Sequence, residues 1–391
     1  MNNPTLPHQF RSFAKSGSWF PIQPLTIERG ERIGVVLLSL GEPQTQEDVR
    51  PFLLRSRIDP SMNVFQRWWT KMQLEREVEA WEIGFEAVGG GAPFTRSKFD
   101  LRHLAEDFLN RKKSTSVGAK FELFLSNSFG PSSHDEVIAA LRDRGIRKIV
   151  LFPLYPHFGR YTTELVLRHW EEALRRQLTS FETSLIHEYA AHPKYIQALK
   201  ERIEETLRRF PAHMREDVQV IFASYGTSRW NRERASDPVD PLIQVTVDAL
   251  ADRWGAKPDR HVSCMGGFSQ TRRPFCQHTA HRIESLIWEG KRAFLMVPVS
   301  FVSERFETAF QLDLVLRNEA HQMGATDFEV CYDLDSHSLF IEALADMVCA
   351  KITSPPAVMK QYQAKDWLVR QSGGREIWIQ SWQEDAIRIA S

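Results

Sequence analysis

Two segments of this chain repeat one pattern, and the repeat limits what the chain can fold into. The segment Glu136–Thr163 aligns without a gap with His281–Thr308, which begins 145 residues later. The matching positions include Gly145 with Gly290, Pro153 with Pro298, and Thr163 with Thr308. Each copy has the pattern of a helix, a glycine turn, an apolar strand, a proline and a loop that leads into a second helix. Two such copies predict two domains of the same topology.

Short apolar runs predict the strands of these domains. The run Ile33–Leu40 is almost wholly apolar and ends at Gly41, the pattern of a parallel strand buried on both faces. Similar runs are Phe121–Leu125, Lys148–Leu154, Val218–Ala223, Arg292–Val299 and Phe328–Cys331. Segments with helical periodicity lie between them, among them His134–Arg144, Pro193–Arg209 and Pro241–Trp254. The fold class is therefore α/β, with two similar Rossmann-type domains, each a parallel four-stranded sheet flanked by helices. We expect the loops after the strands to face a shared cleft between the domains, because open α/β sheets bind ligands there.

The chain divides into four predicted parts. Residues 1–30 are rich in Pro, Ser and Asn and indicate an extended arm, with order beginning at Ile33. Residues 31–170 and 171–350 are predicted to be the first and second α/β domains. Residues 351–391, where Trp367, Trp378 and Trp382 stand among charged residues, are interpreted as a C-terminal helical extension docked on the body.

Composition excludes several classes of protein. Fifty Lys and Arg residues balance fifty Asp and Glu residues, so no global field holds nucleic acid or an anionic membrane. Four scattered cysteines without a C-x-x-C pair favour a reducing compartment, and we expect a cytoplasmic protein. The N-terminus has no continuous apolar region of a signal peptide, and no run of about 18 apolar residues predicts a bilayer span.

Cysteine and histidine residues of the second half allow two interpretations. Cys264 and Cys276 with His278 and His281 would make a metal cluster. The favoured interpretation is a core thiol beside loop residues, because Cys264 ends an apparent strand.

An aromatic segment, residues 61–81, lies outside the repeat. Phe65, Trp68, Trp69 and Met72 share one helical face, beside the basic residues Arg67 and Lys71. One interpretation is a helix that packs its aromatic residues on the core. The others are a lip over an apolar ligand, or a patch that rests on a membrane surface.

The order of motifs in this chain resembles that of the ferrochelatases. The matching segments are Val35–Pro60 with its Leu-Gly-x-Pro turn, Gly89–Pro93, Leu151–Thr163, Val297–Thr308 and Ala343–Val348. They occur in family order between about residues 31 and 350. The resemblance implies a chelatase-like fold and a tetrapyrrole ligand of haem biosynthesis. If the chain is active, it implies a lyase that inserts Fe²⁺ into protoporphyrin or coproporphyrin.

Several residues that the resemblance assigns to metal insertion are replaced. Tyr225 stands where the family has the His that takes the pyrrole protons, and a Tyr with a pKa near ~10 is mostly a donor at neutral pH. Glu307 falls on the family's cleft Glu. Arg305 takes the place of the accompanying His, and Gln311 stands where an acidic residue would continue the metal path, so Fe²⁺ should be repelled. Ser128 and Phe129 replace an Arg and a Tyr of the metal-side wall, and Glu86 and Ala87 replace an Arg pair.

The resemblance gives a set of candidate site residues. We expect Glu307 and Tyr225 to be catalytic and to meet the metal. The residues expected to contact the porphyrin or haem are Tyr225, Arg305, Phe129, Ser128, Tyr155, Arg160, Phe65, Trp68, Pro93 and Arg229. Arg272 and Arg273 are further candidates for binding porphyrin carboxylates.

Three hypotheses of function remain open at the level of sequence. The first is a tetrapyrrole-binding family member with lost or reduced iron insertion, in which Tyr225 either ligates haem iron as a tyrosinate or hydrogen bonds as a phenol. The second is an active ferrochelatase that uses Glu307 and another base, with His157 as the obvious substitute. The third is a non-catalytic partner or regulator of haem synthesis. None requires a resident cofactor: the ligand is haem or porphyrin, Fe²⁺ is the candidate metal, and no iron–sulfur cluster is expected. The expected partners are a haem-pathway protein and a membrane surface, contacted peripherally through Trp68 and Trp69, but not nucleic acid.

Overall fold

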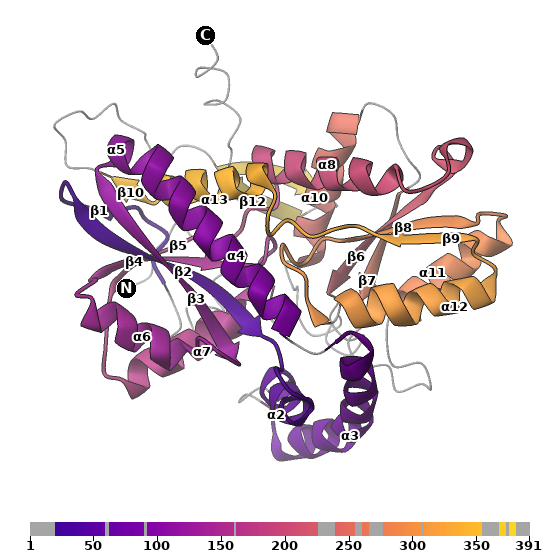
Figure 1. Ribbon diagram of the computed structural model, residues 1–391, viewed down its shortest axis with the longest axis horizontal. Helices are drawn as coiled ribbons and strands as arrows, with labels where there is room; N and C mark the ends of the chain where they lie inside the picture. Colours follow the sequence, from indigo (N-terminus) through magenta and orange to yellow (C-terminus); the bar gives the residue numbers. More distant parts are fainter. Residues whose placement is uncertain are drawn as a thin grey trace, which may run out of the picture.

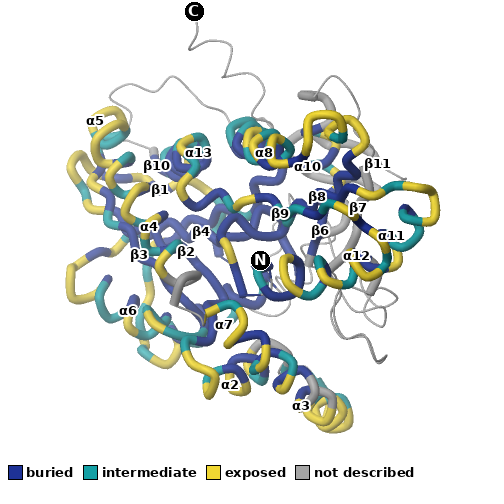
Figure 2. The backbone as a smooth tube through the Cα atoms, turned by 45° about the vertical axis from the view of Figure 1, so that its right-hand side comes forward, coloured by how far each residue is buried: buried dark blue, intermediate teal, exposed yellow. Residues whose placement is uncertain are grey.

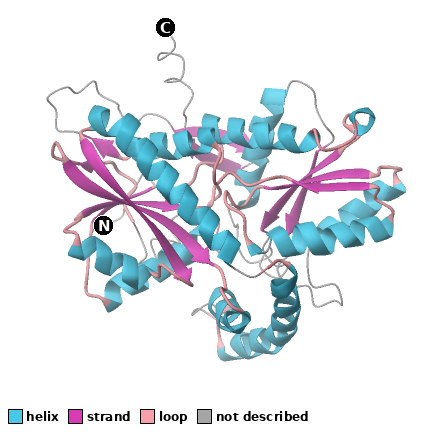
Figure 3. Cartoon of the chain, viewed as in Figure 1, coloured by secondary structure: helices cyan, strands magenta, loops and turns pink. Residues whose placement is uncertain are grey.

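Two parallel four-stranded sheets lie side by side and form the body of the protein (Figures 1 and 3). The computed structural model describes residues 20–58, 62–89, 92–159, 162–225, 239–254, 260–265, 277–306, 308–353, 367–372 and 375–380. The first sheet has the order β3-β2-β4-β5 and consists of β2 (Glu31–Gly41), β3 (Ala119–Phe129), β4 (Lys148–Pro153) and β5 (Glu182–Leu185). The second has the order β7-β6-β8-β9 and consists of β6 (Gln219–Tyr225), β7 (Arg260–Met265), β8 (Ala293–Pro298) and β9 (Asp327–Val330). The two orders correspond strand by strand, which confirms the predicted fold class.

The central strand β2 shows why the apolar runs form buried strands. Every residue from Ile33 to Gly41 is buried, because β2 is covered on both faces and paired along both edges. Val35, for example, lies opposite Leu123 on one side and Val150 on the other. The strands β2, β4 and β8 are accordingly buried along most of their length (Figure 2).

The internal repeat has the same structure in both domains. In the first copy α6 (His134–Asp143) leads into β4, and in the second α11 (Gln277–Trp288) leads into β8. Gly145 and Gly290 both have positive φ, +68° and +90°, and a Cβ atom built on either would meet nothing within 4 Å. Backbone conformation, rather than lack of space, therefore explains the glycine in each turn.

Helices join the two domains into one body. The helix α13 (Ser338–Ala350) follows the last strand of the second domain and packs against both α4 (Ala92–Phe108) of the first and α8 (Pro193–Leu207). The other helices are α2 (Gln46–Arg57), α3 (Val64–Ala87), α5 (Ser114–Val117), α7 (Thr163–Arg176), α10 (Val239–Trp254) and α12 (Arg317–Met323), with the short η1 (Leu109–Lys113), η2 (Ala212–Met214) and η3 (Thr308–Leu316). Both apolar clusters run through both sheets: one contains Leu151 and Met296, and the other Val150 and Leu295. The domains therefore share their core.

Strand pairing moves the domain boundary. We predicted that the second domain begins at residue 171, but that position lies inside α7, and β5 still pairs with β4 in the first sheet. The chain therefore crosses to the second domain after Leu185. Order also begins earlier than predicted, because β1 (Leu25–Thr26) pairs with β10 (Ile352–Thr353) and buries Leu25 and Ile27 beside it.

The C-terminal segment contains a β-hairpin, so the prediction of a helical extension is wrong for its described part. β11 (Trp367–Ser372) pairs antiparallel with β12 (Arg375–Gln380). Two residues, Gly373 and Gly374, separate the strands, and β-branched and aromatic residues such as Val369 and Trp378 fill them. A Gly-Gly pair between two such runs favours a tight hairpin over a helix.

The helices α2 and α3 form a projection below the two sheets (Figure 1). One face of the C-terminal half of α3 is buried, while its N-terminal end is exposed (Figure 2). Within the described part of the chain, no helix has both the length and the hydropathy needed to cross a membrane.

Candidate functional site

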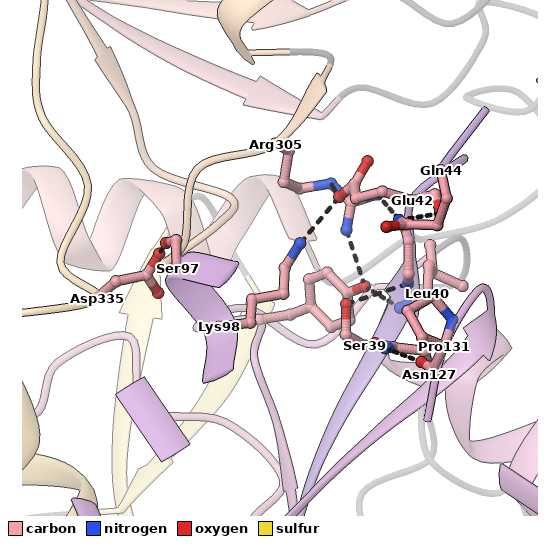
Figure 4. Close-up of polar contacts among 12 residues, drawn as sticks. Ser39, Leu40, Glu42, Gln44, Ser97, Lys98, Asn127, Pro131, Arg305 and Asp335 are labelled. Carbon is pink, nitrogen blue, oxygen red and sulfur yellow. Dashed lines mark hydrogen bonds and ion pairs between the residues drawn. The ribbon is translucent and has the colours of Figure 1, made fainter. Parts of the chain in front are cut away.

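Charged and polar side chains of both domains meet where the strands end. Glu42 directly follows β2, Tyr155 follows β4, and Arg305 lies in the loop after β8. Although Arg305 belongs to the second domain, its guanidinium contacts atoms of the first domain (Figure 4). This edge is the one at which open α/β sheets bind ligands.

One carboxylate oxygen receives two cations at the centre of this region. Glu42 Oε1 lies 3.0 Å from Lys98 Nζ and 3.4 Å from Arg305 Nε. The exposed fraction of each of these three side chains is 2% or less. Ions that are removed from water to this extent are stable only when they are paired, so the three residues depend on one another.

Tyr155 forms a hydrogen bond with Arg305. The Tyr155 hydroxyl accepts a hydrogen bond from the Leu40 backbone N–H at 2.8 Å and one from Arg305 Nη1 at 3.3 Å. Arg305 Nη2 donates to the Gly41 carbonyl at 3.4 Å, and its guanidinium lies 4.8 Å from the ring centre of Phe301. Burial raises the pKa of Tyr155, and the charge of Arg305 opposes that shift. At 1% exposed, Tyr155 positions Arg305 and is not open to a ligand.

A glycine turn aims Glu42 at Arg305. Gly41 has φ +80°, and a Cβ atom there would lie 1.8 Å from the carbonyl oxygen of Phe129 and 3.1 Å from the Asn127 Cβ. Only glycine fits a turn with both this conformation and this close approach.

Acidic residues lie on the other side of Lys98. The hydroxyl of Ser97 donates to Asp335, which is 4% exposed and follows β9. Burial raises the pKa of Asp335, Asp333 and Glu304, and negative neighbours raise those of Asp335 and Glu304 further, while Lys98 opposes the shift at each. Lys98 therefore stands between Glu42 of the first domain and an acidic group of the second. No set of three His, Cys, Asp or Glu side chains in the described ranges has the arrangement of a metal site.

Ser128 and Phe129 contact other residues of the first domain. His134 bridges two serines of β3, with Nδ1 2.7 Å from Ser126 Oγ and Nε2 3.1 Å from Ser128 Oγ. Burial lowers the pKa of His134 to about 3, so the ring is neutral at physiological pH. Phe129 is partly buried and meets Phe52 edge to face, with ring centres 5.5 Å apart.

His157, the substitute base that we considered from sequence, is a buried structural residue. Its Nε2 lies 2.8 Å from Thr246 Oγ1, which donates its own proton to the Ala190 carbonyl at 2.7 Å. Thr246 must therefore accept from His157, which places the ring proton on Nε2. Burial lowers the pKa of His157 to about 3, so it is a poor proton acceptor near neutrality.

Glu188 is a carboxyl group that the sequence did not single out. It lies three residues after β5, and its side chain is 7% exposed. The neighbouring His187 stacks on Phe158 of the β4 loop, with ring centres 4.2 Å apart. Burial raises the pKa of Glu188 to about 8. A carboxyl that titrates near neutrality is suited to proton transfer.

The exposed end of α3 carries the aromatic segment. The exposed fractions are 68% for Phe65, 52% for Trp68 and 43% for Trp69, with Val64 and Met72 exposed beside them. The ring centres of the three aromatic residues lie 6.0 to 6.5 Å apart. The interpretation of this face as core packing is therefore wrong.

The opposite half of α3 meets the segment that leads to Glu307. Trp81 lies 4.4 Å from Phe306 between ring centres, and a Cβ atom on Gly84 would lie 2.3 Å from the ring of Phe310. The N-terminal end of α3 therefore exposes its aromatic residues, whereas the C-terminal half of the helix packs against the second domain.

Several predicted site residues remain predictions. Glu307, Arg160, Arg229, Arg272 and Arg273 lie outside the described residues, as do Cys276 and the side chains of Pro93, Cys264 and His278. The backbone of Tyr225 ends β6 opposite Met265 of β7, but its side chain is outside the described part of the chain. Sequence reasoning missed Glu42 and Lys98. The only signal was an acidic residue at the variable position of the Leu-Gly-x-Pro turn.

Comparisons with known proteins relate this chain to one family. The ferrochelatase family model matches residues 32–352. The chain is 27% identical over 369 residues to a ferrochelatase of Synechocystis sp., covering 89% of this chain and 92% of that protein. It is 29% identical over 325 residues to a ferrochelatase of Geotalea daltonii, covering 81% and 97%. Among solved structures, SirB from Bacillus subtilis with Fe³⁺ aligns at a TM-score of 0.42 and 14% identity, over 64% of this chain and 89% of that one.

The match spans well over half of the chain, so this protein belongs to the ferrochelatase family. Family membership supports a role in tetrapyrrole and haem metabolism.

Proposed function

We propose that this chain binds haem or porphyrin between its two domains and has lost, or nearly lost, the ability to insert iron. The observation that carries the proposal is the state of Arg305. Its guanidinium is buried and permanently charged, and it donates to oxygens of the protein itself. Such a group neither accepts a pyrrole proton nor binds a divalent cation, which an imidazole at this position would do.

The described histidines near this edge do not supply the missing base. Burial lowers the pKa of both His134 and His157 to about 3, and both rings are engaged in hydrogen bonds. Removal of a general base typically costs about 10²- to 10⁴-fold in rate. Tyr225, at the family's His position, is a second position at which a general base is missing.

The phenol of Tyr225 can instead ligate haem iron as a tyrosinate. Tyr225 ends β6 of the second sheet, as Glu42 follows β2 of the first, so each lies at the C-terminal end of a strand, where open α/β sheets bind ligands. This role predicts a tyrosinate-type absorption spectrum for the haem complex. An unchanged spectrum in Tyr225→Phe would remove the ligand role while leaving haem binding intact.

One observation favours an active ferrochelatase as the second candidate. Glu188 has a pKa raised to about 8, so together with Glu307 it would offer a base of the strength that proton removal needs. In that case Fe²⁺ insertion should be measurable and should fall in Glu307→Gln and in Glu188→Gln.

One experiment separates these functions from a third, a non-catalytic partner of haem synthesis. The protein is titrated anaerobically with haem and with metal-free porphyrin, and Fe²⁺ insertion is then assayed on the same sample. Binding without turnover supports the proposal, and steady turnover selects the active enzyme. Absence of affinity for either ligand, together with capture of a haem-pathway protein, selects the non-catalytic partner.

We also propose that the exposed end of α3 rests on a membrane surface, from the cytoplasmic side. Trp and basic residues suit the membrane interface, and Arg67 and Lys71 stand beside Phe65, Trp68 and Trp69. Flotation with vesicles of mixed neutral and anionic lipids should show binding that Trp68→Ser with Trp69→Ser abolishes. Trp288→Ser is the matched control, because Trp288 is 85% exposed at the end of α11. Equal loss in the control would contradict the assignment.

A further inference from the structure

Three hydrogen-bonded side chains form a row that ends at the carboxyl end of β3. His134 Nδ1 lies 2.7 Å from Ser126 Oγ, and His134 Nε2 lies 3.1 Å from Ser128 Oγ. Ser126 is fully buried, whereas Ser128, one residue before the end of the strand, is 7% exposed. Within the described part of the chain, neither serine hydroxyl has another hydrogen bond. The two hydroxyls therefore depend on the imidazole between them.

Burial and the two distances fix the direction of these hydrogen bonds. His134 is neutral at physiological pH, and a neutral imidazole has one donor and one acceptor nitrogen, so one serine donates to the ring and the other accepts from it. If Ser126 accepted, its own O–H would be a buried donor without an acceptor, which is costly. Ser126 therefore donates to Nδ1, and the Nε2–H donates to Ser128. The lengths agree, because the shorter contact suits a hydroxyl donor and the longer one a ring N–H.

This direction leaves one donor unused, the hydroxyl proton of Ser128. Its Oγ accepts from His134, so its O–H bond points away from the ring. Trp170 packs edge to face on the imidazole, with ring centres 5.5 Å apart, and holds the ring in this orientation. Because open α/β sheets bind ligands at the carboxyl ends of their strands, the unused donor lies where a ligand is expected.

The charge near the imidazole favours an anionic acceptor. Burial lowers the pKa of His134 most, and four neighbouring groups act on it further: His169, Arg55 and Arg176 lower it, and Asp135 raises it. Arg176 is compensated by Asp135, its partner at 2.6 Å. Arg55, on α2, has no ion pair with a described carboxylate. Its positive charge therefore stabilises a negative charge on an oxygen that binds at Ser128.

We propose that the hydroxyl of Ser128 donates a hydrogen bond to a carboxylate of the bound tetrapyrrole, and that His134 and Ser126 are positioning residues for this donor. The inference rests on the proposed function, because it assigns one contact of the ligand that the two domains bind. It names the ligand group as an ionised carboxylate. A porphyrin whose carboxylates are esterified therefore loses the benefit of this contact.

Titration of the full chain with protoporphyrin and with its dimethyl ester, followed by porphyrin fluorescence, tests the contact. Ser128→Ala should weaken binding of the diacid by roughly 10-fold or more, because a hydrogen bond to an ionised group is lost, and binding of the diester much less. Ser116→Ala, an exposed serine of α5, is the matched control and should change neither affinity. Equal losses for the two ligands, or no loss for the diacid, would overturn the proposal.

Substitutions at Ser126 test the positioning. Ser126→Ala removes the donor to Nδ1, so His134 can accept the Ser128 proton at Nε2 instead. Affinity for the diacid should then fall although Ser128 is present, while affinity for the diester should change little. Ser126→Thr keeps the hydroxyl and should keep the affinity of the unaltered protein. Full diacid affinity in Ser126→Ala, or an equal loss in Ser126→Thr, would refute the positioning role.

The tautomer of His134 can be measured in the unaltered protein without a ligand. Side-chain nitrogen chemical shifts at neutral pH, assigned by comparison with His134→Gln, should show a neutral ring with its proton on Nε2. A proton on Nδ1, or a charged ring, would overturn the proposal whether or not a tetrapyrrole binds. Absence of affinity for both porphyrins would refute the proposed function as well, whereas binding that does not distinguish them through Ser128 refutes this contact alone.

Discussion

The loops after β4 and β8 occupy equivalent positions in the two halves of the repeat, but their described side chains make different contacts. The described part of the first loop supplies the Tyr155 hydroxyl and an uncharged His157. The second supplies the buried guanidinium of Arg305, whose counterpart in the repeat, Arg160, lies outside the described residues. The repeat therefore reproduces a backbone path in both domains, while the side chains on that path are free to differ. In the first domain this loop carries Tyr155, which accepts a hydrogen bond, and in the second it carries Arg305, which donates that bond.

The difference also explains how the domains hold together. Arg305, in the loop after β8, donates a hydrogen bond to Tyr155, in the loop after β4. Arg305 also pairs with Glu42 of the first domain. The Tyr155 hydroxyl contributes a hydrogen bond to this contact, and Glu42 contributes an ion pair.

Replacement of Arg305 should have the largest effect on the free energy of unfolding. Arg305→Met leaves Glu42 with Lys98 but breaks the contact between the loops, and we expect a loss of about 3 kcal/mol or more in the free energy of unfolding. Urea unfolding at pH 7 measures the change. Arg111→Gln, which breaks an exposed pair with Asp107, is the control and should cost about 1 kcal/mol at most. Equal losses would contradict a special role for Arg305.

A substitution at Gly41 should break the first-domain side of the contact. Gly41→Ala forces a Cβ atom against the Phe129 carbonyl at positive φ, with an expected cost of about 2 to 3 kcal/mol. The turn would also aim Glu42 away from Arg305. Its cost should therefore shrink in the Arg305→Met background, which a double-mutant cycle measures. Full additivity would show that the turn and the charge act independently.

Acid should weaken the contacts of His157, in the loop after β4. The folded-state pKa of His157 is about 3, below the value of ~6.5 expected when the chain is unfolded, so the unfolded state binds the extra proton. Stability from this residue is complete above pH ~6.5 and is lost as pH falls toward 3, at up to about 1.4 kcal/mol per pH unit. His157→Gln should make unfolding less steeply dependent on pH between about 6 and 4. An unchanged pH dependence in His157→Gln would contradict this assignment.

The smallest effects test the symmetry of the repeat. Gly145→Ala and Gly290→Ala each place a side chain at positive φ with no atom within 4 Å, so each should cost about 1 kcal/mol. Thermal unfolding of both variants gives the comparison. Clearly unequal losses would show that the two copies differ in their turns as well as in their loops.

The sequence by itself determined the elements that depend on local pattern. Continuous apolar runs predicted strands such as β2, glycine and proline spacing predicted the repeat, and the motifs indicated the family. Each strand and each copy of the repeat is specified within a few tens of residues, although the two copies begin 145 residues apart. The sequence also contained the Gly-Gly turn and the alternation of β11 and β12, although the charged surroundings led us to expect a helix.

Only the tertiary structure decided the contents of the interdomain site and the exposure of α3. Gly41 and Arg305 are 264 positions apart, and no periodicity in the sequence links Glu42 and Lys98 to that arginine. The same helical face of Phe65, Trp68 and Trp69 would suit a core or a surface, and the projection of α3 away from the sheets selects the surface. Local pattern specifies elements because neighbouring residues share one backbone. The pairing of buried charges depends on how separate elements dock, which neighbouring residues do not encode.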